Sequence, residues 1–218
     1  DPDNVIFTSG GTEANALAIH GAIQAAADAG TRITRLIVSA IEHDSVLATA
    51  SMCEHLYPGL RVSICPAGRD GRISLDDLRR ILMEGKGRAL VSVMAVNNET
   101  GVIQPYAEAA RLAHEHGAMF HCDAVQALGK LSLTMQDCGA DYLTLSAHKI
   151  GGPQGAGAVV RGHGAKLVAQ LRGGQQEFGY RPGTQNVAGI AGFGAAALAV
   201  KNQAHDTVLR DRLEQRMK

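Results

Sequence analysis

The sequence predicts an α/β fold, a three-layer αβα domain built around a mostly parallel sheet of the seven-stranded type. Short apolar runs alternate with longer amphipathic runs along the 218 residues, which is the rhythm of βαβ units. The apolar runs are nearly continuous, as is typical of parallel strands that are buried on both faces. Apolar residues make up 45% of the chain, enough for one domain with a substantial core.

Strands are expected at the short runs of apolar and β-branched residues. In chain order these runs are residues 4–9, 35–40, 61–65, 89–96, 118–124, 141–147 and 157–162. In folds of this class, ligands collect at the carboxyl ends of the strands. Polar residues that directly follow a strand are therefore the first candidates for a functional site.

Helices are expected at the longer amphipathic runs between the strands. These are residues 12–30, 44–57, 74–85 and 106–117, followed by a helical segment from residue 186 to the end of the chain. Gly30 ends the first helix and Asp44 begins the second. Ser74 and Asp77 have the spacing of a capping pair at the start of the third.

Composition and charge exclude several classes of partner. The chain has 21 basic and 21 acidic residues, so its formal net charge is zero, and nucleic acid or an anionic membrane is not an expected partner. Apolar runs fall short of the roughly 18 residues that a membrane span requires. The cysteines Cys53, Cys65, Cys122 and Cys138 form no CxxC pair. This pattern predicts free thiols in a reducing, cytoplasmic protein, and no metal site.

The first candidate for a binding site is the segment TSGGTEAN, residues 8–15. Two glycines follow a strand and precede a helix, so Gly11 and Thr12 would place backbone N–H groups at a helix start that favours anions. The segment is neither a Walker loop nor a GxGxxG loop. The alternative is an ordinary glycine turn with a threonine cap.

Two further candidates each follow an apolar strand. Asp123 would be a buried carboxylate, which needs a cationic partner or several hydrogen-bond donors. Its alternative role is to cap the residues that follow it. Lys149 would be a Schiff-base lysine, whose free amine is favoured where water is scarce. Its alternative is a lysine that extends from a strand end into solvent.

A phosphate-binding loop, an aspartate and a lysine in this order together indicate pyridoxal 5'-phosphate. This cofactor needs an anchor for its phosphate, a partner for its ring nitrogen and a lysine for its aldehyde. An aspartate at the ring nitrogen keeps the ring protonated, so that the ring can withdraw electrons.

Six motifs between residue 7 and about residue 190 closely resemble those of the cysteine desulfurases. These enzymes belong to the class V aminotransferase group of fold-type I pyridoxal-phosphate enzymes. The motifs are FTSGGTEANALAI, EHDSV, VNNETGVIQP, HCDAVQALGK, SAHKIGGPQGAGAV and RPGTQNVAGI. NNETG and RPGTQNV look more like the branch that serves iron–sulfur and nitrogenase assembly.

The resemblance implies roles for residues around the cofactor ring. Lys149 would hold the cofactor through a Schiff base, Asp123 would pair with its pyridine nitrogen, and Gln126 would bond its phenolic oxygen. His43 would stack on the ring and move protons during catalysis. The alternative for His43 is a capping histidine before a helix.

The resemblance also implies contacts around the rest of the cofactor. The expected phosphate ligands are Gly11, Thr12, Ser146 and His148. Thr184 would reach the phosphate of a neighbouring subunit in a homodimer. Asn98 would lie near the substrate carboxylate and a cofactor oxygen.

A desulfurase takes L-cysteine to L-alanine and passes the sulfur to an acceptor or scaffold protein. The family's nucleophilic cysteine and its substrate-binding arginine lie far beyond the lysine, and the four cysteines here are not expected to replace that nucleophile. Residues 1–218 are therefore expected to be the cofactor-binding large-domain core, truncated at both ends, without the N-terminal arm and the small domain, and inactive alone.

Two other readings remain open from the sequence. One is a selenocysteine lyase or an aminotransferase of class V that uses the same core. The other is a non-catalytic module for cofactor binding or dimerisation.

Overall fold

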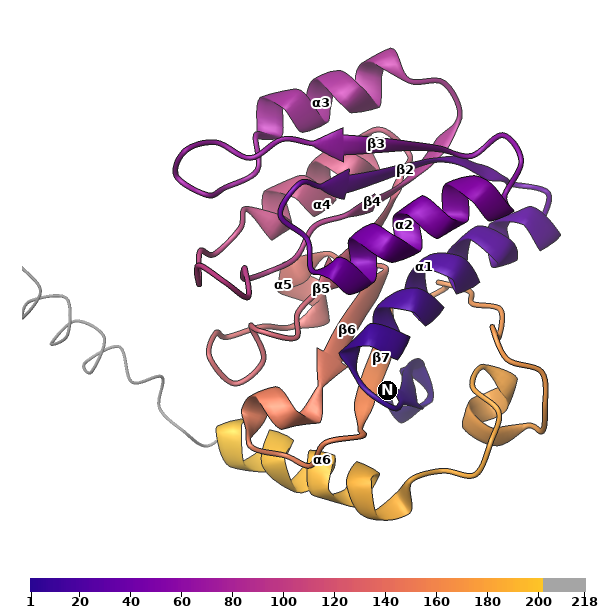
Figure 1. Cartoon of the computed structure of the whole chain (residues 1–218), viewed down its shortest axis with the longest axis vertical. Helices are drawn as coiled ribbons and strands as arrows, with labels where there is room; N and C mark the ends of the chain where they lie inside the picture. The colour runs from indigo at the N-terminus through magenta and orange to yellow at the C-terminus, as the bar shows by residue number, and fades with distance from the viewer. Residues whose placement is uncertain (202–218) are drawn as a thin grey trace, which may run out of the picture.

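A seven-stranded sheet runs through the protein, with the strand order β1-β7-β6-β5-β4-β2-β3 (Figure 1). The computed structural model describes residues 1–201. The strands are β1 (Val5–Thr8), β2 (Ile33–Ser39), β3 (Arg61–Cys65), β4 (Arg88–Ser92), β5 (Met119–Asp123), β6 (Tyr142–Ser146) and β7 (Gly157–Arg161). Neighbouring pairs from β3 to β6 are parallel, whereas β7 is antiparallel to both β6 and β1. The predicted mostly parallel sheet is therefore confirmed.

Helices cover both faces of the sheet, which confirms the three-layer prediction. The helices are α1 (Gly11–Asp28), α2 (Asp44–Leu56), α3 (Leu75–Glu84), α4 (Tyr106–Glu115), α5 (Met135–Cys138) and α6 (Val187–Lys201). Apolar residues of α1 and α2 share one buried cluster with the strands, and those of α3, α4 and α5 share another on the opposite face. In Figure 1, α6 lies beyond the edge of the sheet near β7.

The differences from the predicted elements are local. The strand expected at residues 89–96 ends at Ser92, although the Val93 and Ala95 N–H groups still bond the carbonyls of His121 and Asp123 on β5. α1 begins at Gly11, one residue earlier than predicted. Short elements were not predicted, namely α5 and the 3₁₀ helices Pro2–Asn4, Ala147–Ile150 and Gln176–Gly179. The part of the last predicted helix beyond residue 201 lies outside the described residues.

The topology brings five loops to one edge of the sheet. β1, β2, β4, β5 and β6 all run in the same direction, so their carboxyl ends lie together. Each of these strands leads into a segment that holds one of the predicted site residues. The fold therefore gathers segments that are far apart in the sequence, as expected for this class of sheet.

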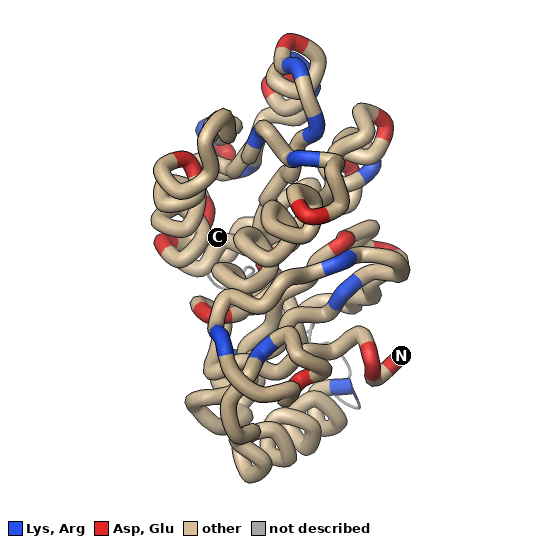
Figure 2. The backbone as a smooth tube through the Cα atoms, turned by 90° about the vertical axis from the view of Figure 1, so that its right-hand side faces the viewer, with Lys and Arg blue, Asp and Glu red and all other residues tan. Residues whose placement is uncertain are grey.

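Charged residues of both signs are interspersed along the backbone, as Figure 2 shows. Several form ion pairs along single helices, such as Arg80 with Asp77 and Glu84 on α3. Among residues 1–201, the structure has no helix with the length and apolar character that a membrane crossing needs.

Candidate active site

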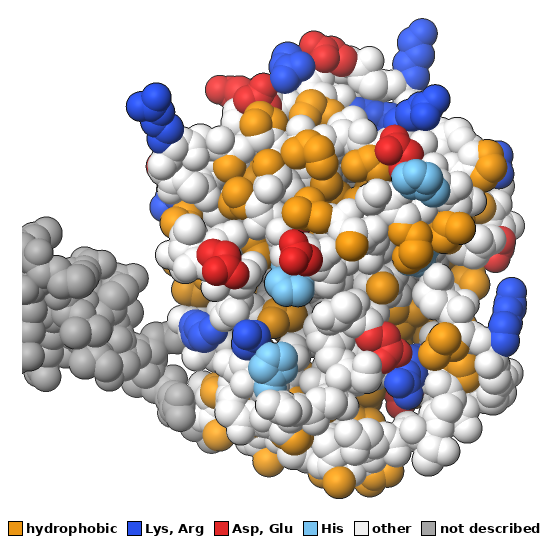
Figure 3. Space-filling view, viewed as in Figure 1, with side chains coloured by type: hydrophobic (Ala, Val, Ile, Leu, Met, Phe, Trp, Pro, Cys, Tyr) orange, Lys and Arg blue, Asp and Glu red, His pale blue; other side chains and the backbone are white. Residues whose placement is uncertain are grey.

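A cavity of about 330 Å³ opens at the carboxyl edge of the sheet. Its volume falls within the range of small-molecule sites. The residues that line it are Gly11, Thr12, Asn15, His43, Ser45, Met94, Asn98, Glu99, Asp123, Val125, Gln126, Ser146, His148 and Lys149. In Figure 3, histidine, basic and acidic side chains gather on this face of the protein. The structure therefore brings together every predicted site residue except Thr184.

The start of α1 forms one wall of the cavity. Gly10 precedes the helix, and no side chain among the described residues caps its first turn. The threonine cap, which was the alternative prediction for this segment, is therefore not formed. Backbone N–H groups of the first turn remain available to an anion. The start of β7 packs tightly behind this loop. A Cβ added at Gly157 would lie 2.5 Å from the carbonyl carbon of Gly10.

Asp123 ends β5 and is buried, as predicted. Its Oδ1 accepts a hydrogen bond from the Val125 N–H at 3.0 Å, and its Oδ2 accepts one from Asn15 Nδ2 at 2.7 Å. Burial raises the pKa of Asp123, while the bonds from Val125 and Asn15 and the nearby His43 oppose that shift. The residue thus both caps its local turn and places a carboxylate oxygen at the cavity.

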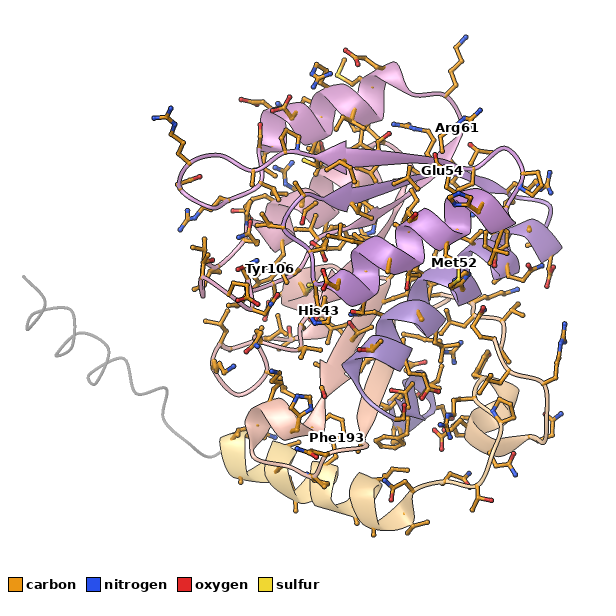
Figure 4. All side chains as sticks on the ribbon, viewed as in Figure 1. His43, Met52, Glu54, Arg61, Tyr106 and Phe193 are labelled. Carbon is orange, nitrogen blue, oxygen red and sulfur yellow. The ribbon has the colours of Figure 1, made fainter. Side chains whose placement is uncertain are left out.

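His43 is the N-cap residue of α2, and Figure 4 shows its side chain at the beginning of that helix. Its Nδ1 accepts a hydrogen bond from the Ser45 N–H at 3.0 Å and lies 2.7 Å from Ser45 Oγ. The capping role and the cavity-lining role, which the sequence presented as alternatives, are therefore both present.

Lys149 lies in the 3₁₀ helix Ala147–Ile150, three residues after the end of β6. Its side chain lines the cavity but is exposed, and so is that of His148. The expectation that water is scarce around Lys149 is wrong for this chain. The cause is the 3₁₀ turn, which carries the chain out of the sheet before the lysine is reached. Ser146, which ends β6, stays buried and bonds His148 Nδ1 at 2.8 Å through its Oγ.

Asn98 and Gln126 line the cavity and have their own partners. Asn98 Nδ2 donates to Glu99 Oε1 at 2.7 Å. Gln126 Oε1 accepts from Lys130 Nζ at 2.6 Å. A second amine therefore lies close to the cavity that contains Lys149.

Thr184 lies apart from the other predicted residues. It is exposed and lines a different hollow, formed with Phe7, Arg181 and their neighbours. Two contacts fix its loop to the rest of the domain. Arg181 Nε donates to Glu13 Oε1 at 2.8 Å, and the Phe7 N–H donates to Glu177 Oε2 at 2.8 Å.

The family model of the class V aminotransferases matches residues 1–217. The chain belongs to the class V aminotransferase family. It is 44% identical to a cysteine desulfurase of Cereibacter sphaeroides over 97% of this chain and 53% of that protein. It is 42% identical to the cysteine desulfurase IscS of Dictyoglomus turgidum over 89% of this chain and 48% of that protein.

Solved structures of class V aminotransferase relatives share the fold. The NifS-like protein of Rickettsia africae matches with a TM-score of 0.84 and 32% identity, over 98% of this chain and 57% of that one. A structure of SspA in complex with cysteine matches with a TM-score of 0.82 and 33% identity, over 99% of this chain and 60% of that one. The chain spans about half the length of the curated relatives that it matches.

All four cysteines of this class V aminotransferase chain are free and buried. Burial raises the pKa of Cys53 to about 12 and that of Cys65 to about 11. Cys122 points into the core on the α3–α4 face, opposite to the side on which Asp123 meets Asn15, as strand alternation predicts. Cys138 lies in the same core cluster, and none of the four thiols lines the cavity.

The sequence analysis missed Asn15, Ser45 and Glu42. Asn15 and Ser45 line the cavity, and the signal that could have found Asn15 is a polar amide among the apolar residues of the buried face of a helix. Glu42, next to His43, is also buried. Its Oε1 accepts hydrogen bonds from the Met94 N–H at 2.7 Å and from Ser39 Oγ, whereas its Oε2 is enclosed without a partner among the described residues.

Burial raises the pKa of Glu42 to about 8, and the nearby Asp123 adds to the shift. Because Glu42 Oε2 is enclosed without a hydrogen-bond partner in the described part of the chain, the uncharged form of its carboxyl is favoured.

Replacing Glu42 with glutamine is expected to remove a pH-dependent loss of stability. Below pH 4.5 the residue is protonated in both the folded and the unfolded chain. Between pH 4.5 and about 8 only the folded chain keeps the proton, so the wild type loses stability as the pH rises through this window. The full difference is of the order of 5 kcal/mol.

Urea unfolding at pH 5, 6.5 and 8 measures the difference between the wild type and the Glu42→Gln variant. The exposed neighbour Asp44 provides a matched control as Asp44→Asn. A difference between wild type and Glu42→Gln that stays constant across the three pH values would show that Glu42 is ionised in the folded protein.

Proposed function

We propose that this chain is the cofactor-binding core of a pyridoxal-phosphate-dependent cysteine desulfurase. One observation carries the proposal, namely that the uncapped start of α1, the buried Asp123 carboxylate and the Lys149 amine all face a single cavity. The similarity to cysteine desulfurases of other organisms supports the choice of reaction within the family.

The residues present fit the cofactor. The uncapped N-terminal turn of α1, Ser146 and His148 would hold its phosphate, Asp123 its ring nitrogen, and Gln126 its phenolic oxygen. When bound, the group supplies an electron-withdrawing ring that makes the bonds around the substrate's α-carbon easier to break.

The chain's own residues would position the substrate and move its proton. Lys149 projects from a short helix into the cavity and can both attach the cofactor covalently and accept the α-proton of an amino acid. His43 presents its ring at the same cavity, and Asn98 supplies an amide near the substrate's carboxylate.

Sulfur transfer would require a thiol that this part of the protein does not place at the cavity. In the proposed reaction a protein thiol attacks the sulfur of cysteine, which yields L-alanine and a protein persulfide and returns the proton of the thiol to the alanine methyl group. The four thiols described here are buried outside the cavity, so the chain alone is not expected to release alanine.

Exchange of the α-proton of L-cysteine with solvent deuterium tests the proposal without requiring sulfur transfer. In D₂O with pyridoxal phosphate, the chain is expected to exchange this proton at a rate well above that of free cofactor. Proton NMR of the recovered amino acid measures the rate, and Lys149→Ala should lower it to the free-cofactor level.

The same experiment separates the remaining readings. Cofactor binding without exchange would favour a non-catalytic module. Exchange accompanied by rapid alanine release would show that one of the four buried cysteines is reached by the substrate. Faster exchange with selenocysteine than with cysteine would favour a lyase.

We also propose that the parent protein forms a homodimer and delivers sulfur to an acceptor or scaffold protein in iron–sulfur assembly. The exposed position of Thr184, on a loop that is fixed by Arg181 and Glu177, is suited to contact a second subunit. Sedimentation equilibrium of the cofactor-loaded protein tests the dimer, and a fully loaded monomer would rule it out.

A further inference from the structure

Asn15 on α1 connects cavity residues that lie at the end of β5 and at the start of α2. Its Nδ2 donates hydrogen bonds to Asp123 Oδ2 at 2.7 Å and to Ser45 Oγ at 2.9 Å. Ser45 Oγ lies 2.7 Å from His43 Nδ1. One buried amide therefore contacts the carboxylate at the end of β5 and, through Ser45, the imidazole at the start of α2.

The directions of these hydrogen bonds follow from the donors. Both hydrogens of the Asn15 amide are used, so Ser45 Oγ accepts from Asn15 and its own hydrogen is free for His43 Nδ1. The Ser45 backbone N–H, which can only donate, is also directed at Nδ1. His43 Nδ1 is therefore an acceptor, and the proton of the neutral ring is on Nε2.

A second buried group holds the Asn15 amide in this orientation. Thr144 Oγ1 donates to Asn15 Oδ1 at 2.5 Å and lies 3.4 Å from His121 Nε2. His121 Nδ1 in turn lies 2.8 Å from Ser92 Oγ. Complete burial lowers the pKa of His121 to about 3, so its ring is neutral and carries one hydrogen.

All the hydrogen bonds of this network then run in one direction. The Ser92 hydroxyl donates to His121 Nδ1, His121 Nε2–H donates to Thr144, and Thr144 donates to Asn15. Reversing any one bond would leave two donors or two acceptors facing each other inside the protein, which is costly for buried groups.

We infer that Asn15 is a positioning residue that orients the Asp123 carboxylate and, by directing the Ser45 hydroxyl at His43 Nδ1, reinforces the Ser45 backbone N–H in holding the ring proton of His43 on Nε2. The residue has no direct role in bond breaking. The effect of Asn15 is that His43 presents a hydrogen-bond donor at Nε2, the ring nitrogen that does not contact α2. The consequence for catalysis rests on the proposed function, but the position of the proton does not.

Ring ¹⁵N shifts of the cofactor-free chain, labelled at its histidines, measure where that proton lies. The spectrum of a His43→Gln variant identifies the two signals of His43. The wild type is expected to show an unprotonated Nδ1 and a protonated Nε2. The network has two branches, one from Asn15 through Ser45 to His43 and one from Asn15 to Asp123. Carbon-13 titration of the Asp123 carboxyl measures the second branch independently.

Asn15→Asp replaces the donor by an acceptor of the same shape. Ser45 would then donate to residue 15 instead of His43, and residue 15 would share a proton with Asp123. Both readouts are therefore expected to move: the two His43 nitrogen signals converge, and the Asp123 titration shifts to higher pH. Gln24→Glu makes the same chemical change on the outer side of α1, where Gln24 bonds only Asp28, and is expected to leave both readouts unchanged.

Ser45→Ala separates the two branches, because it should move the His43 signals and leave the Asp123 titration in place. If Asn15→Asp does not reach the wild-type fold by circular dichroism, Ser45→Ala and Thr144→Val carry the test, and Thr144→Val is expected to move both readouts. A protonated Nδ1 in the wild type, or His43 signals unmoved by Ser45→Ala, would overturn the inference. Because no cofactor is present, neither result depends on the proposed reaction.

Discussion

Replacing Lys149 with arginine is expected to abolish covalent retention of pyridoxal phosphate while keeping the positive charge at the cavity. The Lys149 amine can form a bond to the cofactor's aldehyde, whereas a guanidinium remains protonated and is not nucleophilic at neutral pH. After reduction with borohydride, mass spectrometry should find the cofactor on the peptide with Lys149 in the wild type, and no labelled peptide in Lys149→Arg.

Lys130 provides the matched control for this experiment. Its Nζ bonds Gln126, a cavity residue, and burial together with the nearby Lys149 lowers its pKa. Lys130 is therefore an amine that could compete for the aldehyde. Lys130→Arg is expected to leave the labelling of Lys149 intact, and a reduced adduct on Lys130 in the wild type would show that the wrong lysine has been assigned.

Replacing Asp123 with asparagine is expected to slow α-proton exchange by about 10²–10³-fold, the size of effect seen when one hydrogen-bond donor that stabilises developing charge is removed. Stability should change little, because two effects oppose each other. Burial raises the pKa of Asp123, so the ionised carboxylate is costly to the folded protein at neutral pH, and asparagine removes that charge. The single oxygen of asparagine, however, can accept from only one of the Asn15 and Val125 donors, and its NH₂ group faces the other. We therefore expect a melting temperature close to that of the wild type together with slower exchange.

Asp123→Ala distinguishes this charge effect from loss of structure. Alanine leaves both the Asn15 and the Val125 donor without an acceptor, so its melting temperature should fall below that of Asp123→Asn, which keeps one of the two bonds. Thermal unfolding by circular dichroism and deuterium exchange are measured on the same samples. Full exchange activity in Asp123→Asn would show that the carboxylate's charge is not needed.

Much of the site was predictable because it follows the strands. Asp123 and Ser146 end strands whose unbroken apolar runs are clear in the sequence, and His43 caps a helix that begins at a recognisable Asp. The side of the sheet that Cys122 faces can also be derived from the sequence, because alternation along a strand depends only on local geometry.

Contacts between distant segments were not predictable in the same way. Asn15 meets Asp123 and Thr144, and Glu42 meets the Met94 backbone, only after the sheet has formed. The exposure of Lys149 was missed because a single 3₁₀ turn after β6 decides it, and such a turn has little signature in an apolar segment that ends in glycines.

The position of β1 has a consequence for how this protein reaches its binding-competent state. Val5 pairs with Val160, so β1 finds its partner only after the roughly 150 residues between the two strands have been made. β1 leads directly into the start of α1, and the start of β7 packs against that loop. Such distant pairing is slow to form, and we expect the cofactor to be captured late, after the sheet closes. Cofactor at 100 times its dissociation constant would then stabilise the closed sheet by about 2.7 kcal/mol. Binding of the cofactor would therefore favour the pairing of β1 with β7, two strands that are far apart in the sequence.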